Sequence, residues 1–229
     1  VYHPADHRLL LCDSLQKKDR FETFPAFSPD GRTLYFCSAE AKKIPEEYKE
    51  IRYNLCSIDF DPSAGTFGSR IDTLVNAEAL GKSVSFPRPS YDGKYIMFTL
   101  SDYGNFSIWH KEADLWLLDL TSGDLRKLSE VNSDDTESFH NWSSNSRWFV
   151  FSSRRGDGLY TRLYLASMDE NGKISKPFLL PQEDPETYYD RSVYSYNVPD
   201  FTSEPIKIDT RVFEKKITSK ERIQVQAKK

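Results

Sequence analysis

One 13-residue pattern occurs three times in this chain of 229 residues and limits the folds open to it. The copies are FPAFSPDGRTLYF, FPRPSYDGKYIMF and FHNWSSNSRWFVF, starting at residues 24, 86 and 139. Each begins with an aromatic residue, turns on Asp-Gly or Asn-Ser, and ends in an apolar run that closes on Phe. Gly and Asn accept the positive φ of tight turns, so each copy predicts a β-hairpin, and the repetition predicts a repeat architecture.

The second strand of each hairpin is apolar at successive positions, in the runs TLYFC, YIMF and WFVF. A strand that is apolar on both faces is covered on both faces, as in sheets stacked face to face. The first strand of a hairpin carries Pro25 in one copy, and Pro87 and Pro89 in another. Proline donates no hydrogen bond to a ladder, so this strand is expected at the edge of its sheet, along a central channel.

Two further strands follow each hairpin. The third strands are predicted at residues 54–60, 114–120 and 162–168. The fourth strands are predicted at residues 71–75, 125–128 and 174–180. Repeated units of four antiparallel strands are typical of propeller blades. The predicted fold class is therefore all-β, with about three antiparallel four-stranded blades of a β-propeller plus flanking strands.

The repeat also divides the chain. Residues 24–201 hold the blades and a closing segment, in which YSYNVPDF (residues 194–201) resembles one further inner strand. Residues 1–23 are expected to form the outer strand or strands of a preceding blade and a linker, and residues 202–229 a C-terminal extension. The blades themselves are expected at residues 24–81, 86–130 and 138–182.

Other architectures fit less well. A β-sandwich would show short strands without the 13-residue repeat, and a helical array would show a period of 3.6. Aromatic residues make up 14% of the chain, which favours half-buried pleated surfaces. Only KKIPEEYKEIR (residues 42–52) has a helical pattern, with Pro45 in its first turn, and we interpret it as a loop.

Charge and cysteine content exclude several classes of function. The net charge of −4 comes from interleaved signs, so no nucleic-acid surface is expected, and no apolar run reaches the roughly 18 residues of a membrane span. Cys12, Cys37 and Cys56 fit no metal spacing. Cys37 and Cys56 fall on neighbouring predicted strands, where they could form a disulfide or remain two buried thiols.

The unit PxFSPDGxxLxF, followed by DLWLLDLTSGDLRKL, resembles the WD40-like (PD40) repeats of TolB-type β-propellers. The second copy has Tyr91 in place of the turn proline, and the third has Ser-Asn-Ser in place of Pro-Asp-Gly. The segments KPFLLPQ and YNVPDF resemble the end of exported TolB-like proteins, so the resemblance covers residues 24–201. It implies the C-terminal part of a larger propeller, of six or more blades.

The resemblance further implies a non-enzymatic binding or assembly module of the bacterial cell envelope, with a protein or peptide partner. It implies an exported protein, periplasmic or associated with the outer membrane. No cofactor or metal is expected, because the chain contains no CxxCH and no metal-ligand spacing. The alternative is the propeller of a larger hydrolase, a serine peptidase or glycan-active enzyme whose catalytic residues lie elsewhere. The chain itself contains no GxSxG and no HExxH motif. Three blades cannot close a ring, so missing blades or self-association are expected.

The candidate binding residues lie on long loops, which the predicted topology gathers on one face. These residues are Trp109, His110, Arg154, Arg155, Glu137 and His140. Trp109 and His110 could form a ligand platform, or a Trp packed over the blade edge beside a solvated His. Arg154 and Arg155 could clamp an anion or carboxylate, or tie down their own loop.

Glu137 and His140 are expected at the mouth of an inner strand. His140 could bind a metal or move protons, but no second His lies at ligand spacing, which favours a hydrogen-bonded structural role.

Overall fold

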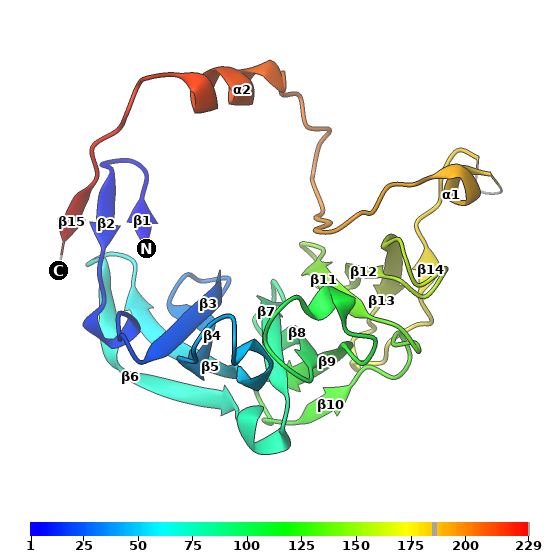
Figure 1. Ribbon diagram of the computed structural model, residues 1–229, viewed down its shortest axis with the longest axis horizontal. Coiled ribbons are helices and arrows are strands. Elements are labelled where there is room, and N and C mark those ends of the chain that lie inside the picture. The colour runs from blue at the N-terminus through cyan, green and yellow to red at the C-terminus, as the bar shows by residue number, and fades with distance from the viewer. Residues whose placement is uncertain (185–186, 229) are drawn as a thin grey trace.

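The computed structural model describes residues 1–184 and 187–228 and contains three four-stranded antiparallel sheets arranged in an arc (Figure 1). The first blade consists of β3 (Arg20–Phe27), β4 (Thr33–Glu40), β5 (Asn54–Asp61) and β6 (Thr66–Val75). The second consists of β7 (Ser83–Pro89), β8 (Tyr95–Ser101), β9 (Asp114–Asp119) and β10 (Leu125–Lys127). The third consists of β11 (Glu137–Trp142), β12 (Trp148–Ser153), β13 (Arg162–Ser167) and β14 (Phe178–Leu179). The predicted all-β fold of propeller blades is confirmed.

The strands within each blade are hydrogen-bonded in chain order. β3, β7 and β11 each lie at one edge of their sheet, as Pro25, Pro87 and Pro89 predicted for the first two of them. The predicted third strands match β5, β9 and β13 closely. Among the fourth strands, β6 begins earlier than predicted and β14 is shorter, although a bridge between Met168 and Ile174 precedes β14.

Apolar side chains from both faces of the middle strands fill the spaces between blades. Tyr35 and Cys37 of β4 pack with Ile96 and Phe98 of β8 between the first two blades. Met97, on the other face of β8, belongs to the core between the second and third blades. The apolar runs of β4 and β8 are therefore buried from both sides, as predicted, whereas Trp148 at the start of the third run is 41% exposed.

Cys37 and Cys56 are free thiols. Cys37 pairs with Leu55 in the register of β4 and β5, and Cys56 is the next residue along β5. Because successive side chains of a strand point to opposite faces, Cys37 lies in the core toward the second blade and Cys56 in the cluster on the outer side of the first blade. The two sulfurs are thus separated by the sheet itself.

The N-terminal residues cover the outer face of the first blade. β1 (Tyr2–His3) and β2 (Arg8–Leu10) form a small hairpin, and the 3-10 helix η1 (Asp13–Leu15) follows. Cys12 and Leu15 pack on the cluster that contains Leu34 and Phe36 of β4. This face is therefore partly shielded by the chain itself.

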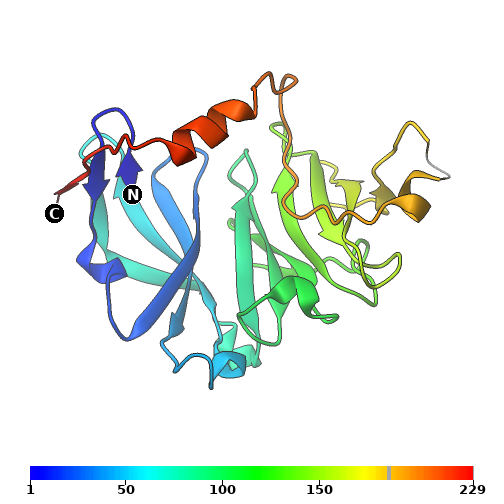
Figure 2. The same ribbon diagram turned by 45° about the horizontal axis from the view of Figure 1, so that its top comes forward.

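The C-terminal residues cross the arc from the third blade to the first (Figures 1 and 2). They contain α1 (Tyr188–Arg191), α2 (Arg211–Thr218) and β15 (Gln226–Lys228). β15 pairs in parallel with β2, which brings the two termini close together. The other short helices are η2 (Tyr48–Glu50), η3 (Glu78–Leu80) and η4 (Ser107–Trp109).

No helix in the described part of the chain is both long and apolar enough to cross a membrane.

The prediction of a further inner strand at residues 194–201 is wrong. The backbone N–H of Tyr196 donates to the carbonyl of Thr161 at 3.1 Å, and the hydroxyl of Ser152 donates to the carbonyl of Tyr196 at 2.9 Å. Arg162 donates to the carbonyl of Tyr194 at 2.6 Å. One backbone carbonyl and two side chains of the third blade bind the backbone of this segment, which is an extended strap and forms no ladder with another strand.

We expect Phe98→Ala to destabilise the protein by about 3–5 kcal/mol, because Phe98 is completely buried between two blades and its removal leaves a cavity. Phe106→Ala is the matched control, since Phe106 is 79% exposed and its loss should change stability by about 0.5 kcal/mol or less. Urea unfolding followed by tryptophan fluorescence measures both. Equal losses would contradict the described packing of the blades.

Candidate functional site

The first aromatic residue of each repeat lies at a β-bulge of an inner strand. The register of β3 against β4 shifts between Thr23 and Ala26, and β7 and β11 shift at the equivalent positions. Phe24, Phe86 and Phe139 have φ angles of 52°, 53° and 50°. A left-handed conformation is costly for an aromatic residue, by about 1–3 kcal/mol. The bulge redirects each ring out of the pleat.

The three rings form a continuous row across the inner edges of the blades. The ring centroids of Phe24 and Phe86 are 4.3 Å apart, and those of Phe86 and Phe139 are 4.7 Å apart. Both pairs are tilted and lie in the range of favourable aromatic contacts. One residue from each repeat therefore contributes to a single apolar surface that no blade forms alone.

A cavity of about 310 Å³ lies where this row meets the loop between β8 and β9, and we call it the phenylalanine cavity. Phe106 of that loop also lines it, with a φ of 52°. Gly104 holds the loop against the first blade, because a Cβ there would lie 2.4 Å from the ring of Tyr53. All the lining phenylalanines thus have positive φ, which is how their rings come to converge on one space.

Trp109 and Arg154 meet beside this cavity, on the face that carries the long loops. Trp109 is 66% exposed, and the guanidinium carbon of Arg154 lies 4.6 Å from the centroid of its ring. The Arg154 guanidinium also donates to the carbonyl of Gly158 in its own loop. Two residues predicted separately as binding candidates therefore form one cation–π pair that faces solvent on its Trp side.

Glu137 and Arg155 form a buried ion pair. The Arg155 guanidinium lies 2.9 Å from a Glu137 carboxylate oxygen and also donates to the hydroxyl of Ser153. Ser133 and Ser153 hydroxyls donate to the same carboxylate oxygen at 2.6 and 2.7 Å. Burial raises the pKa of Glu137, while the hydrogen bonds and Arg155 act in the opposite direction. Glu137 and Arg155 therefore hold the loop that follows β12 against the third blade.

His110 and His140 are both buried. His110 packs on Tyr103, with ring centroids 4.0 Å apart, and its Nδ1 lies 3.3 Å from a carboxylate oxygen of Glu112. His140 Nε2 lies 2.9 Å from the carbonyl of Met97 in the second blade and donates the hydrogen bond to it. Burial lowers the pKa of His140 to about 3, so the ring is neutral. Within the described residues, no group of three His, Cys, Asp or Glu side chains is placed to hold a metal ion.

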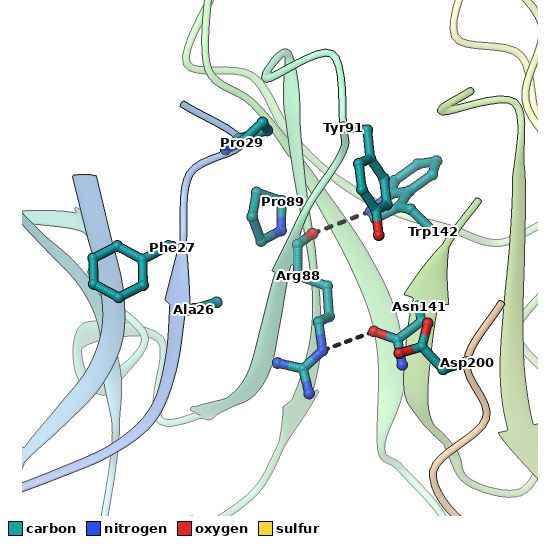
Figure 3. A pocket seen from close by; sticks show the side chains of 9 residues that line it. All are labelled: Ala26, Phe27, Pro29, Arg88, Pro89, Tyr91, Asn141, Trp142 and Asp200. Carbon is teal, nitrogen blue, oxygen red and sulfur yellow. Dashed lines mark hydrogen bonds between the residues drawn. The ribbon is translucent and has the colours of Figure 1, made fainter. Parts of the chain in front are cut away.

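A second cavity, of about 230 Å³, lies on the other side of the phenylalanine row, toward the hairpin turns (Figure 3). Its polar residues are Arg88 of β7, Asn141 of β11 and Asp200 of the C-terminal strap. Arg88 Nε donates to Asn141 Oδ1 at 2.9 Å, and Asn141 Nδ2 donates to the carbonyl of Pro199 at 2.6 Å. Burial lowers the pKa of Arg88, and Asp200 partly offsets this effect.

Neither the phenylalanine row nor a role for Arg88 was predicted from the sequence. Aligning the three repeats places Ala26, Arg88 and Asn141 in one column, with Arg88 and Asn141 as its polar members. Residues in one column take equivalent positions on adjacent inner strands, so the alignment held a signal that the two side chains meet. The left-handed conformation of the phenylalanines has no comparable signal, because it depends on the bulge.

No family model matches this sequence, and no curated protein matches it. Solved propeller structures do match. TolB from Acinetobacter baumannii is 18% identical with a TM-score of 0.40, over 68% of this chain and 32% of that chain. A putative TolB from Agrobacterium tumefaciens is 20% identical with a TM-score of 0.47, over 71% of this chain and 50% of that chain.

The β-propeller domain of the Trilobed protease from Pyrococcus furiosus is 17% identical with a TM-score of 0.41, over 72% of this chain and 44% of that chain. This chain therefore matches at most half the length of each of these three structures. TolB proteins stand among the matches. The assignment as a propeller rests on the three blades themselves.

We expect His140→Gln to weaken the acid sensitivity of the fold. The pKa of His140 is lowered from 6.5 to about 3, so the unfolded chain binds the extra proton between these values. The contribution of the neutral His140 ring to the free energy of unfolding is fully present above pH 6.5. It decreases by about 1.4 kcal/mol per pH unit as the pH falls from 6.5 toward 3. Gln can still donate to the Met97 carbonyl but does not titrate.

Urea unfolding between pH 7.5 and 4.5 measures the difference between His140→Gln and the unmodified protein. His3→Gln, at an exposed position, is the control. If the three free energies of unfolding fall in parallel as the pH is lowered, the assignment of His140 as a buried neutral ring is contradicted.

Proposed function

We propose that this chain is a non-enzymatic binding module that takes an apolar or aromatic side chain of a protein or peptide partner into the phenylalanine cavity. The observation that carries the proposal is the convergence of Phe24, Phe86, Phe106 and Phe139 on one space. All of them have positive φ. Backbone strain of this kind concentrates at functional sites, because the surrounding structure must hold it in place.

The surroundings of the cavity support a peptide ligand. Phe106 is 79% exposed at its rim, and the Trp109–Arg154 pair lies on the same loop face. Exposed aromatic and Arg side chains are the residue types that dominate binding energy once an interface buries them. A cavity of about 310 Å³ accommodates a large side chain of a partner and leaves the partner's backbone on the loop face.

The cellular setting is part of the proposal. The resemblance of residues 24–201 to TolB-type propellers supports an exported protein of the bacterial envelope, periplasmic or associated with the outer membrane. We propose that the blades act within a larger propeller or within a self-associated ring. In either arrangement the long-loop face remains the working surface.

We expect Trp109→Ala, Arg154→Ala and Phe106→Ala each to weaken partner binding by about 1 kcal/mol or more, because exposed aromatic and Arg side chains dominate binding energy once an interface buries them. A library of random displayed peptides, selected on the immobilised protein, supplies the ligand. The dissociation constants of one selected peptide for the variants are then compared by fluorescence anisotropy.

The matched controls are Arg32→Ala and Lys94→Ala, which change exposed residues on the hairpin turns at the opposite end of the blades. They should leave the dissociation constant unchanged. Equal losses in both sets, or a larger loss from Arg32 and Lys94, would place the binding surface on the turn face and refute the proposal.

A further inference from the structure

The cavity on the turn side of the phenylalanine row contains one positive charge in an apolar frame (Figure 3). Arg88 is the only basic residue among the nine that line it. The walls consist mainly of aromatic and proline side chains. These are Phe27, Pro29, Pro89, Tyr91 and Trp142. The cavity draws on the inner strands of all three blades, so it exists only in the assembled arc.

The Arg88 guanidinium is oriented but not neutralised. Its Nε donates to Asn141 at 2.9 Å, and its Nη1 makes a longer bond of 3.3 Å to the carbonyl of Pro87. No ion pair joins it to a carboxylate within residues 1–184 and 187–228, although Asp200 is near enough to influence its pKa. Figure 3 shows the far end of the guanidinium facing away from Asp200, into the cavity.

Arg88 is also held in this position from behind. Asn141, which accepts from Nε, is itself fixed by the carbonyl of Pro199. The indole N–H of Trp142 donates to the backbone carbonyl of Arg88 at 3.1 Å. The terminal N–H groups of this partly buried and oriented guanidinium can still donate to a ligand. Folding has already removed part of its hydration, so binding an anion costs less further desolvation.

We propose that Arg88 binds the carboxylate of a peptide residue in this cavity, with Asn141 as the positioning residue. The site is separate from the phenylalanine cavity, so a negative result for one of the two binding proposals leaves the other standing. The terminal nitrogens of a guanidinium match the two oxygens of a carboxylate. The aromatic and proline walls fit the hydrocarbon part of the residue that carries it.

A carboxylate fits the charges better than a phosphate does. One guanidinium offers a single positive charge, and the carboxylate of Asp200 already offsets part of it. A phosphate group with nearly two negative charges would need a second cation, and Arg88 is the only basic residue among the described residues that line the cavity.

The test is a titration followed by NMR, with the Arg88 Nε–Hε and Asn141 side-chain amide signals as reporters. Four probes are compared: N-acetylglutamate α-amide, N-acetylglutamine, N-acetylglutamine α-amide and inorganic phosphate. The first carries only a side-chain carboxylate and the second only a C-terminal carboxylate. The probe that binds more tightly therefore shows which of the two kinds of peptide carboxylate the site prefers. We expect saturable shifts from one or both, and none from the neutral third probe.

Arg88→Gln should weaken carboxylate binding about tenfold or more, because a charge-assisted hydrogen bond is lost. Arg32→Gln, on an exposed turn outside the cavity, should have no effect. Equal shifts from the neutral probe, tighter binding of phosphate, or unchanged affinity in Arg88→Gln would overturn the proposal.

Asp200→Asn gives a second test that leaves the blades intact, since Asp200 is an exposed residue of the strap. Removing this negative charge should strengthen carboxylate binding roughly threefold or more. Weaker binding in Asp200→Asn would also contradict the proposal.

Discussion

Stacking of blade on blade buries Phe98 and Phe149 completely, and every other feature of the molecule depends on this contact. β8 shows how it works, because Phe98 packs toward the first blade while Met97 packs toward the third. A strand that is apolar on both faces loses half of its burial if either neighbour is missing. The blades therefore stabilise one another in sequence along the arc, as units of a repeat protein do.

This stacking also determines what the inner strands can do. Each inner strand has only one neighbour in its own sheet, so it tolerates prolines and a bulge that a central strand would not. The bulges turn Phe24, Phe86 and Phe139 toward one another, and the row of rings separates a cavity on the loop side from one on the turn side. Two chemically different surfaces result, one apolar and one built around Arg88.

The two ends of the arc are covered by different segments of the chain. The first blade is covered by Cys12 and Leu15, which pack on its outer cluster. The third is crossed by the strap, whose backbone carbonyls accept hydrogen bonds from Ser152 and Arg162. β15 and β2 then join the two ends. The cover is largely apolar at one end and largely polar at the other.

The sequence by itself determined the blades. Apolar runs at successive positions, turn residues and inner prolines predicted nearly every strand of the three sheets, because each of these signals is local and reflects the burial of one strand. It did not determine how residues of different blades meet. The contact of Arg88 with Asn141, 53 positions apart, depends on the rotation between stacked sheets. The separation of Cys37 from Cys56 depends on strand register. The strap at residues 194–201 was expected to be a strand because its sequence is a degenerate echo of the inner strand of the repeat. Local pattern specifies burial, whereas the site arises from the arrangement of the blades, which only the tertiary structure decides.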